Sequence, residues 1–298
     1  MKLAAIVVTF FPANEEFVKN TESYIDFVER LYVWDNTPIE RRSERNDGIA
    51  AIKEKYPGKV FCFENDKNVG LGYAYNKGIK RAKQDGFTHL MTMDQDSSFQ
   101  QFEGFKQNVE KAANTEEIDK IGVYMPLRNQ PQVYSDWEPY GQKGLLQSGA
   151  IFPLRLFDKV GLFREDFFID GIDEEMGYRL RKYGYRVTVY SGCNMIHQIG
   201  SGHRASFCGI RFSIPDYAPM RGFYILRNKT FLRKEYAYEF GIDWHYWFVK
   251  QYIFKYIVKI IFGEKNKMEK ISAIGKGLYY GLFSIHKPYK PNQFEDAL

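Results

Sequence analysis

The sequence predicts an α/β protein with a mostly parallel central sheet flanked by helices, followed by a helical extension at its C-terminal end. Three observations support this fold class. Short apolar runs alternate with longer amphipathic segments through the first half, several of these runs end in polar or acidic residues, and the chain beyond Arg221 is aromatic and basic. Strands that alternate with helices favour a parallel sheet with right-handed crossovers. A chain of 298 residues is long enough to bury the core of such a domain.

The individual elements follow from local patterns. Leu3–Phe10 is a continuous apolar run, as expected of a strand buried on both faces, and Pro12 ends it. Asn14 followed by Glu15 and Glu16 is typical of a helix cap and an acidic first turn. Further strands are predicted at Leu31–Trp34, Val60–Phe63, Thr88–Met93, Ile121–Met125, Leu146–Phe152 and Arg186–Tyr190. Further helices are predicted at Ile49–Tyr56, at residues 71–84, at Phe102–Ala113 and at Phe157–Val160.

Charge and cysteine content narrow the class of protein. The net charge is +5, but residues 221–298 carry +7 and residues 1–220 carry −2, so the basic character belongs to the C-terminal part. This distribution argues against nucleic acid as a partner of the main body. Three scattered cysteines suit neither a disulfide framework nor a zinc site, so a cytoplasmic protein is expected. The apolar run Leu3–Phe11 is short for a signal peptide and lacks a small-residue cleavage site.

A predicted strand ends in two carboxylates, Asp94 and Asp96, which are separated by one residue. In an open α/β sheet, ligands bind at the carboxyl ends of the strands. Residues i and i+2 of an extended segment project to the same side, so both carboxylates can face one site. Two carboxylates at such a short distance repel each other unless a cation lies between them. Mg²⁺ and Mn²⁺ both accept such oxygen ligands. The alternative is an Asx-rich turn that only ends the strand.

Other predicted strands of the first half are also followed by polar residues, at Thr9, Asp35 and Asn68. A parallel sheet places these ends along one edge, where they would line a nucleotide-binding cleft. Gly70 and Gly72 belong neither to a Gly-x-Gly-x-x-Gly fingerprint nor to a P-loop, so a Rossmann dehydrogenase and a P-loop NTPase are not favoured. Alternatively, these glycines only permit a tight turn from strand to helix.

The second half contains a further acidic cluster, Asp170–Glu175. A positioned carboxylate such as Asp173 can take the proton of an attacking hydroxyl group. Alternatively, these acidic residues only complement the start of the helix that follows. His197 follows a predicted strand and is either a ligand or a structural residue. The segment at residues 200–209 has the composition of a mobile loop.

Several of these motifs occur together in a characteristic order. In the first half they are Val8-Thr9-Phe10-Phe11, Trp34-Asp35-Asn36, Asn68-Val69-Gly70, Ala74-Tyr75-Asn76-Lys77-Gly78 and Met93-Asp94-Gln95-Asp96. In this order they resemble the nucleotide-sugar half of glycosyltransferase family 2, which implies the GT-A fold. In the second half, the motifs are Phe168–Glu175 with Arg179, His197 and Arg227-Asn228. These are similar to bacterial rhamnosyltransferases, and galactofuranosyltransferases share part of the pattern.

The resemblance, which covers roughly residues 3–285, implies roles for particular residues. The implied contacts to a pyrimidine nucleotide sugar are Thr9, Phe11, Asp35, Asn68, Gly70, Asn76 and Asp94. Asp96 would bind the metal ion directly, Asp94 would serve the ribose or the metal, and His197 would contact the metal or the diphosphate. Asp173 falls where the family has its catalytic base. Tyr75 departs from the family pattern, in which arginine often precedes the asparagine.

The resulting hypothesis is an inverting glycosyltransferase that depends on Mg²⁺ or Mn²⁺. The expected donor is dTDP-rhamnose, and the expected acceptor is a hydroxyl group of a surface glycan or a lipid-linked oligosaccharide. The alternatives are a transferase of another sugar, such as galactofuranose from UDP, a nucleotidyltransferase, and a non-catalytic scaffold of a glycan-assembly complex. A nucleotidyltransferase is disfavoured because Val8–Asn14 lacks a basic, glycine-rich triphosphate loop.

The C-terminal part suggests a peripheral membrane location. The predicted domains are a catalytic domain at residues 1–220, with a nucleotide-sugar half at 1–100 and an acceptor half at 101–220, and a helical region at 221–298. Trp244–Phe262 is dense in aromatic residues and is interrupted by Lys250, Lys255 and Lys259. These lysines spoil a membrane span but suit an interfacial helix on an anionic membrane at the inner face of the cell. Packing against the catalytic domain or another subunit is the alternative.

Overall fold

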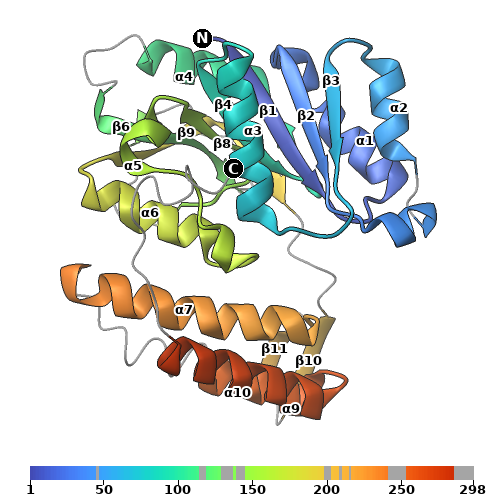
Figure 1. Ribbon diagram of the computed structural model, residues 1–298, viewed down its shortest axis with the longest axis vertical. Helices are drawn as coiled ribbons and strands as arrows, with labels where there is room; N and C mark the ends of the chain where they lie inside the picture. Colours follow the sequence, from blue (N-terminus) through green and yellow to red (C-terminus); the bar gives the residue numbers. More distant parts are fainter. Residues whose placement is uncertain are drawn as a thin grey trace. The chain divides into compact units, whose positions relative to one another are not determined.

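The computed structural model separates the chain into two compact units, which Figure 1 colours along the sequence. The structure describes residues 1–44, 47–113, 119–128, 137–138, 145–197, 203–207, 210–214, 216–240 and 253–284. Among these, the first unit contains the residues up to Glu165 and those from Met176 to His197. The second unit contains Asp166–Glu175 and the described residues from His203 to Ser284.

The first four strands form the parallel part of the sheet in the first unit (Figure 1). They are β1 (Leu3–Thr9), β2 (Arg30–Asp35), β3 (Val60–Glu64) and β4 (His89–Asp94). Their order is β3-β2-β1-β4, with all three pairs parallel. Every residue of β1 is buried, which explains why its sequence is a continuous apolar run. The register pairs Thr9 with Asp35 and Val8 with Asp94, so the polar strand ends meet at one edge.

Beyond β4 the sheet is mixed and continues in the order β8-β6-β9-β5, with β7 beside β9. The bounds are β5 (Ser97–Gln100), β6 (Ile121–Arg128), β7 (Trp137–Glu138), β8 (Ala150–Pro153) and β9 (Arg186–His197). β8 is antiparallel to β4 and β6, and β9 is parallel to β6. β5 is antiparallel to β9, which places Ser97 opposite His197. This pairing brings the end of β9 to the turn that follows Asp94.

Helices pack on this sheet and complete the core of the first unit. The α-helices are α1 (Asn14–Glu22), α2 (Gly48–Lys55), α3 (Leu71–Gln84), α4 (Phe102–Ala112) and α5 (Leu156–Val160), and α6 (Ile172–Lys182) has its first turn in the second unit. The 3₁₀ helices are η1 (Ile25–Phe27), η2 (Ile39–Glu44) and η4 (Glu165–Phe167). Helix α3 lies very close to β1, since a Cβ atom on Gly78 would be 2.3 Å from Cδ1 of Ile6. A side chain at position 78 would have to displace Ile6, so glycine allows this close approach without such a shift.

The second unit contains a strand pair and a group of helices. Its elements are β10 (His203–Phe207), β11 (Ile210–Ile214), α7 (Pro219–Phe240), α9 (Lys255–Gly263) and α10 (Lys267–Phe283). Helix α10 runs alongside α7 (Figure 1). A Cβ atom on Gly277 would lie 2.3 Å from the carbonyl oxygen of Phe223, and one on Gly281 would lie 2.6 Å from Cβ of Thr230. These glycines therefore allow the two helices to touch.

Most predicted elements are present, with differences where pairing is long-range. The predicted strand Leu146–Phe152 is shorter, at Ala150–Pro153, and β5 was not predicted. The expectation of a mobile loop at residues 200–209 is wrong for His203–Phe207, which form β10 against β11. Much of the predicted aromatic helix Trp244–Phe262 lies outside the described residues, and α9 covers its end. In the described ranges, no helix is long and apolar enough to cross a membrane. The predicted functional boundary at residue 220 stays a prediction.

Candidate active site

Asp94, Asp96 and His197 come together at the carboxyl end of β4. Each can offer one ligand atom such that all three atoms lie within 4.8 Å of one another, and no other such group occurs in the described part of the chain. Nδ1 of His197 is 3.4 Å from Oδ1 of Asp96 and 3.8 Å from Oδ2 of Asp94. The β4–β5 turn supplies the carboxylates, and the β5–β9 pairing supplies the imidazole.

Hydroxyl groups around this cluster fix its side chains. The Ser97 hydroxyl lies 2.6 Å from Nδ1 of His197, and the Ser148 hydroxyl donates to the Ser97 hydroxyl at 2.8 Å. Ser148 also accepts the backbone N–H of Asp94 at 3.1 Å. The buried Tyr75 donates its hydroxyl to Oδ1 of Asp94 at 3.4 Å. The position at which the sequence departs from the family pattern therefore lies against the acidic cluster.

The electrostatics of the cluster suit a divalent cation. Burial raises the pKa of the Asp94 carboxyl, His197 lowers it, and the neighbouring Asp96 raises it again. The net effect is a raised pKa, so a bound divalent cation would stabilise the charged form of Asp94. Two carboxylate oxygens with one imidazole nitrogen fit Mn²⁺ well, and the oxygens alone are also acceptable to Mg²⁺. The residues present therefore fit the metal that the sequence predicts.

The predicted base-binding residues cluster at the ends of β1 and β2. The Thr9 hydroxyl donates to Oδ1 of Asp35 at 3.2 Å, and the same oxygen accepts the backbone N–H of Thr37 at 3.0 Å. The Thr37 hydroxyl accepts the backbone N–H of Phe11 at 3.0 Å. Phe11 has a left-handed φ of 47°, and the Arg41 guanidinium lies 4.4 Å from its ring centre. This network holds the backbone after β1 in an unusual conformation. Backbone strain of this kind is common at functional sites.

Asn36 links this edge to the loop before α3. Its amide donates to the carbonyl of Gly70 at 3.3 Å, and its side-chain oxygen accepts the backbone N–H of Val69 at 3.3 Å. The side-chain oxygen of Asn68 accepts the N–H of Gly70 at 2.9 Å. Gly70 has φ 83°, a conformation that favours glycine. The geometry is therefore compatible with both roles considered for Gly70. It makes the turn from strand to helix, and it lies beside Asn68, another predicted nucleotide contact.

Asn76 has a different environment from the other predicted nucleotide contacts. It is buried, and its amide donates to the carbonyl of Phe163 at 3.0 Å and to Oε1 of Glu165 at 2.9 Å. Its side-chain oxygen accepts the backbone N–H of Phe163 at 2.9 Å. These bonds tie α3 to the segment that follows α5. A direct nucleotide contact for Asn76 stays a prediction.

Asp173 lies in the first turn of α6, within the second unit. It is half-buried, and one of its carboxylate oxygens accepts the backbone N–H of Glu174 at 2.8 Å. Glu174 forms an ion pair with Lys229 of α7. Burial lowers the pKa of Lys229 to about 8, while Asp173 and Asp170 raise it. Asp173 thus belongs to a charged cluster that contains its own cation.

Several neighbours of the predicted site residues were not predicted. They are Ser97, Ser148, Arg221 and Lys229. A cross-strand partner for His197 is visible only once β5 pairs with β9, since the two elements are about a hundred residues apart. Burial alternates along β5, but Phe99 is its one apolar residue, so the sequence gives little local signal for this strand.

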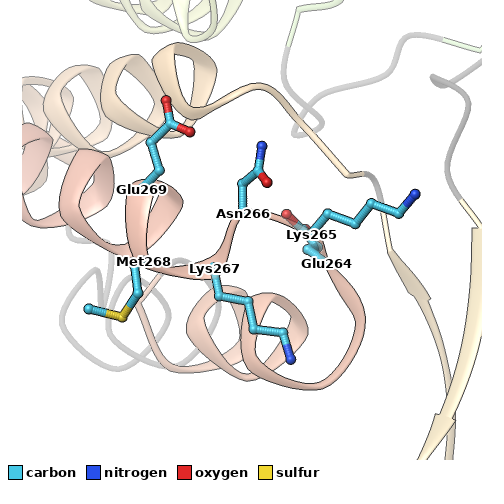
Figure 2. Close-up of a pocket in the computed structure, with 6 residues that line it drawn as sticks. All are labelled: Glu264, Lys265, Asn266, Lys267, Met268 and Glu269. Carbon is cyan, nitrogen blue, oxygen red and sulfur yellow. The ribbon is translucent and has the colours of Figure 1, made fainter.

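The described residues also line a hollow at the turn between α9 and α10 (Figure 2). Its volume is about 610 Å³, and its lining residues are Glu264, Lys265, Asn266, Lys267, Met268 and Glu269. Two acidic and two basic side chains line it, and Nζ of Lys270 donates to Oε2 of Glu264 at 2.8 Å. None of its lining residues is aromatic, and its carboxylate Glu264 already pairs with Lys270, so we do not assign the hollow to the donor.

Comparison with known proteins defines the class of this protein. Residues 42–136 match the family model for glycosyl transferase family 2. Together with the α/β sheet and the acidic cluster after β4, this match identifies a nucleotide-sugar glycosyltransferase. Within that class, the chain is similar to bacterial rhamnosyltransferases. It is 27% identical over 286 residues to dTDP-rhamnosyl transferase RfbF of Shigella flexneri, and the alignment covers 89% of this chain and 90% of the relative.

Solved structures confirm the predicted GT-A fold. The chain is similar to GalNAc-T7, solved with UDP, GalNAc and Mn²⁺, with 16% identity and a TM-score of 0.59. It is also similar to the mannosyltransferase PcManGT of Pyrobaculum calidifontis, solved with GDP-Man and Mn²⁺, with 14% identity and a TM-score of 0.54. These matches cover 82% and 76% of this chain but only 50% and 63% of the two other chains.

Proposed function

We propose that this enzyme is an inverting, metal-dependent rhamnosyltransferase. It would move L-rhamnose from dTDP-rhamnose to a hydroxyl group of a surface glycan or a lipid-linked oligosaccharide. The observation that carries the proposal is the grouping of Asp94, Asp96 and His197 at the strand end in a family 2 type of chain. The similarity to a dTDP-rhamnosyl transferase over nearly the whole chain supports the choice of donor.

The donor would lie along the edge formed by β1, β2 and β4. Thr9, Phe11 and Asp35 would hold the pyrimidine base and the adjacent ribose, with Asn68 and Gly70 beside them. The hydrogen bonds between Thr9, Asp35 and Thr37 pre-organise this edge before the nucleotide arrives. Asp94 would contact the ribose or the metal ion. Asn76 would act through the packing of α3 or touch the nucleotide directly.

The reaction requires that the diphosphate leaving group be stabilised and that a base accept the proton of the acceptor hydroxyl. A cation bound by Asp94, Asp96 and His197 would supply positive charge to the diphosphate as the bond to the sugar breaks. Asp173 would accept the proton of the acceptor hydroxyl as its oxygen attacks the anomeric carbon. A single displacement inverts that carbon, so no covalent nucleophile on the enzyme is required.

The choice of donor can be tested by transfer assays with purified enzyme. We expect transfer from dTDP-rhamnose with Mn²⁺ or Mg²⁺ and loss of transfer in a chelator. Transfer from UDP-galactofuranose instead would establish the alternative sugar. Failure to bind or turn over any nucleotide sugar, in a protein that is folded by circular dichroism, would favour a non-catalytic scaffold of a glycan-assembly complex.

The second unit also presents an unusual apolar surface. Ten of the fourteen exposed large apolar side chains of the described residues lie in it, including Met268 at 80%, Phe283 at 71% and Tyr279 at 61% exposure. Exposed lysines lie nearby, and Figure 2 shows Lys265 and Lys267 beside Met268. An apolar surface flanked by basic residues is complementary to anionic lipid. We therefore propose an anionic membrane surface, at the inner face of the cell membrane, as a partner of α9 and α10.

Vesicle flotation tests the membrane proposal. Replacing Lys265, Lys267 and Lys276 together with Glu should release the protein from anionic vesicles, because each basic residue near the surface contributes about 1 kcal/mol. The same change at three exposed lysines of the first unit, Lys2, Lys53 and Lys111, should leave binding unchanged. If wild type does not bind anionic vesicles, or forms a dimer that buries this surface, the membrane proposal is wrong.

A further inference from the structure

The acidic segment Asp166–Glu175 of the second unit has an unusual backbone. Phe168 and Asp170 have left-handed φ values of 62° and 59°, and Gly171 has φ 83°. A left-handed conformation costs a residue with a side chain about 1–2 kcal/mol. Such conformations persist only where surrounding contacts enforce them. The contacts that enforce this one come from α7.

Asn228 of α7 makes the central contact. It is fully buried, and its amide nitrogen lies 2.9 Å from the carbonyl oxygen of Phe167, 2.9 Å from that of Ile169 and 2.7 Å from that of Asp170. An amide has two N–H groups, so at least one of them is shared between two of the three carbonyls. Two of these carbonyls belong to the residues on either side of Phe168, and the third belongs to Asp170 itself. One side chain therefore satisfies the carbonyls that the unusual turn points inward.

The orientation of the Asn228 amide is itself fixed. Its side-chain oxygen accepts Nε–H of Arg227 at 2.9 Å, so the amide nitrogen must face the acidic segment. Arg227 also donates to the carbonyl of Asp166, and its guanidinium lies 4.6 Å from the ring centre of Tyr224. Asn228 and Arg227 thus bind the same segment from adjacent positions.

Further contacts recur along the same helix. Arg221 forms two hydrogen bonds with the Asp170 carboxylate, at 2.9 and 3.1 Å. Tyr224 stacks on Phe168 with ring centres 5.0 Å apart. The Tyr236 hydroxyl donates to Oε1 of Glu175 at 2.8 Å, within the core. Contacts at intervals of three, four and eight residues lie on one side of a helix. One side of α7 therefore contacts the acidic segment along its length.

We propose that Asn228 is a positioning residue for Asp173. By holding the carbonyls of Phe167, Ile169 and Asp170, it fixes the turn from which the first turn of α6 starts, and with it the Asp173 carboxylate. The inference rests on the proposed role of Asp173 as the base. It gives α7, which the sequence places in a separate C-terminal region, a direct part in catalysis through the position of that base.

Two substitutions distinguish hydrogen bonding from simple packing. Asn228→Asp keeps the shape of the side chain but turns a carboxylate oxygen toward three carbonyl oxygens. Asn228→Ala leaves a space in which water can donate to those carbonyls. A positioning role through N–H donation therefore predicts that turnover falls in the order wild type, Ala, Asp. A role in packing alone predicts the opposite order for the two variants, because Asp has the same volume as Asn.

The experiment measures kcat with saturating donor and acceptor, and in parallel the Kd of dTDP with Mn²⁺ by calorimetry. We expect kcat to fall on the order of 10²-fold in Asn228→Asp, as for a misplaced catalytic group, with the Kd of dTDP changed less than about twofold. Thr230→Val is the matched control, since it removes a buried hydroxyl that bonds within α7 to the carbonyl of Leu226 at 2.7 Å. It should keep wild-type kcat.

Asp173→Asn, assayed beside these variants, separates the two ideas. If Asp173→Asn keeps normal turnover, the proposed base is wrong. If Asp173→Asn is inactive while Asn228→Asp turns over like wild type, or better than Asn228→Ala, the positioning role of Asn228 is wrong and the base assignment stands. Should Asn228→Asp fail to fold, a wild-type kcat in Asn228→Ala would also overturn the proposal.

Discussion

The two acidic clusters of the molecule are compensated in opposite ways. In the first unit, Asp94 and Asp96 face the imidazole of His197 and hydroxyl groups, and among the described residues no lysine or arginine pairs with them. In the second unit, Asp170 and Glu174 each pair with a cationic side chain of α7. Carboxylates without a fixed cation are suited to bind an external one, whereas paired carboxylates are held in place by the protein itself. We therefore expect the carboxylates of the first cluster to bind a cation and those of the second to be held in place by α7.

The largest effect that would test this contrast is expected at Asp173. Asp173→Asn is nearly isosteric and removes the carboxylate that would accept the proton, so transfer should fall by about 10²–10⁴-fold. Donor binding should survive, because the carboxylates assigned to the metal ion are untouched. Turnover and the Kd of dTDP with Mn²⁺ measured on the same preparation would show this split. Asp158→Asn, at an exposed ion pair with Lys83, is the control. A parallel loss of donor binding would break the contrast between the clusters.

A smaller effect should appear as acid sensitivity of the first unit that comes from a buried histidine in its core. Burial lowers the pKa of His89 to about 4, from an ordinary value of 6.5. The unfolded chain therefore binds a proton in this pH range that the folded chain excludes, so the free energy of unfolding falls as the pH drops from about 6.5 to 4. The loss should reach about 3 kcal/mol.

Urea unfolding at pH 7 and pH 4.5 measures this loss. His89→Phe has no titrating group and should lose less stability than wild type over the same interval. Equal losses in both proteins would assign the acid sensitivity to groups other than His89.

The smallest effect concerns the hydroxyl groups that hold the metal cluster. The Ser97 hydroxyl contacts both His197 and Ser148, and groups that orient metal ligands are commonly worth 10–100-fold in metal affinity. Ser97→Ala should therefore weaken Mn²⁺ binding by about tenfold. Ser98→Ala, at the next position of β5, should leave the affinity unchanged. Calorimetric titration with Mn²⁺ distinguishes them, and equal affinities in both variants would remove Ser97 from the support of the site.

Local sequence was enough to predict the first half of the fold and the acidic strand end. The apolar run of β1 and the Asp94–Asp96 pair each lie within a few consecutive residues. Their place in a parallel sheet can therefore be predicted from the local pattern alone. The resemblance to glycosyltransferase family 2 added His197 and Asp173, which no local pattern distinguishes from structural residues.

What the sequence did not reveal depends on contacts between distant segments. The hydrogen bonds from Asn228 of α7 to the acidic segment join residues 58 to 61 positions apart. Nothing in the sequence near Asn228 indicates that its amide faces three carbonyls. The buried bonds of Asn76 to Phe163 and Glu165 are likewise set by packing of α3. An asparagine reads the same in sequence whether it contacts a ligand or the protein backbone.

The role assigned to the first acidic cluster is tested most directly by dTDP binding in the presence and absence of Mn²⁺. Calorimetry should show that Mn²⁺ tightens dTDP binding to wild type and to Asp158→Asn. In Asp96→Asn, which should remain folded, the effect of Mn²⁺ should disappear, because a carboxylate that binds the metal ion has been replaced by a neutral amide. Binding of dTDP to Asp96→Asn with an unchanged dependence on Mn²⁺ would contradict the assignment of this cluster as the metal site.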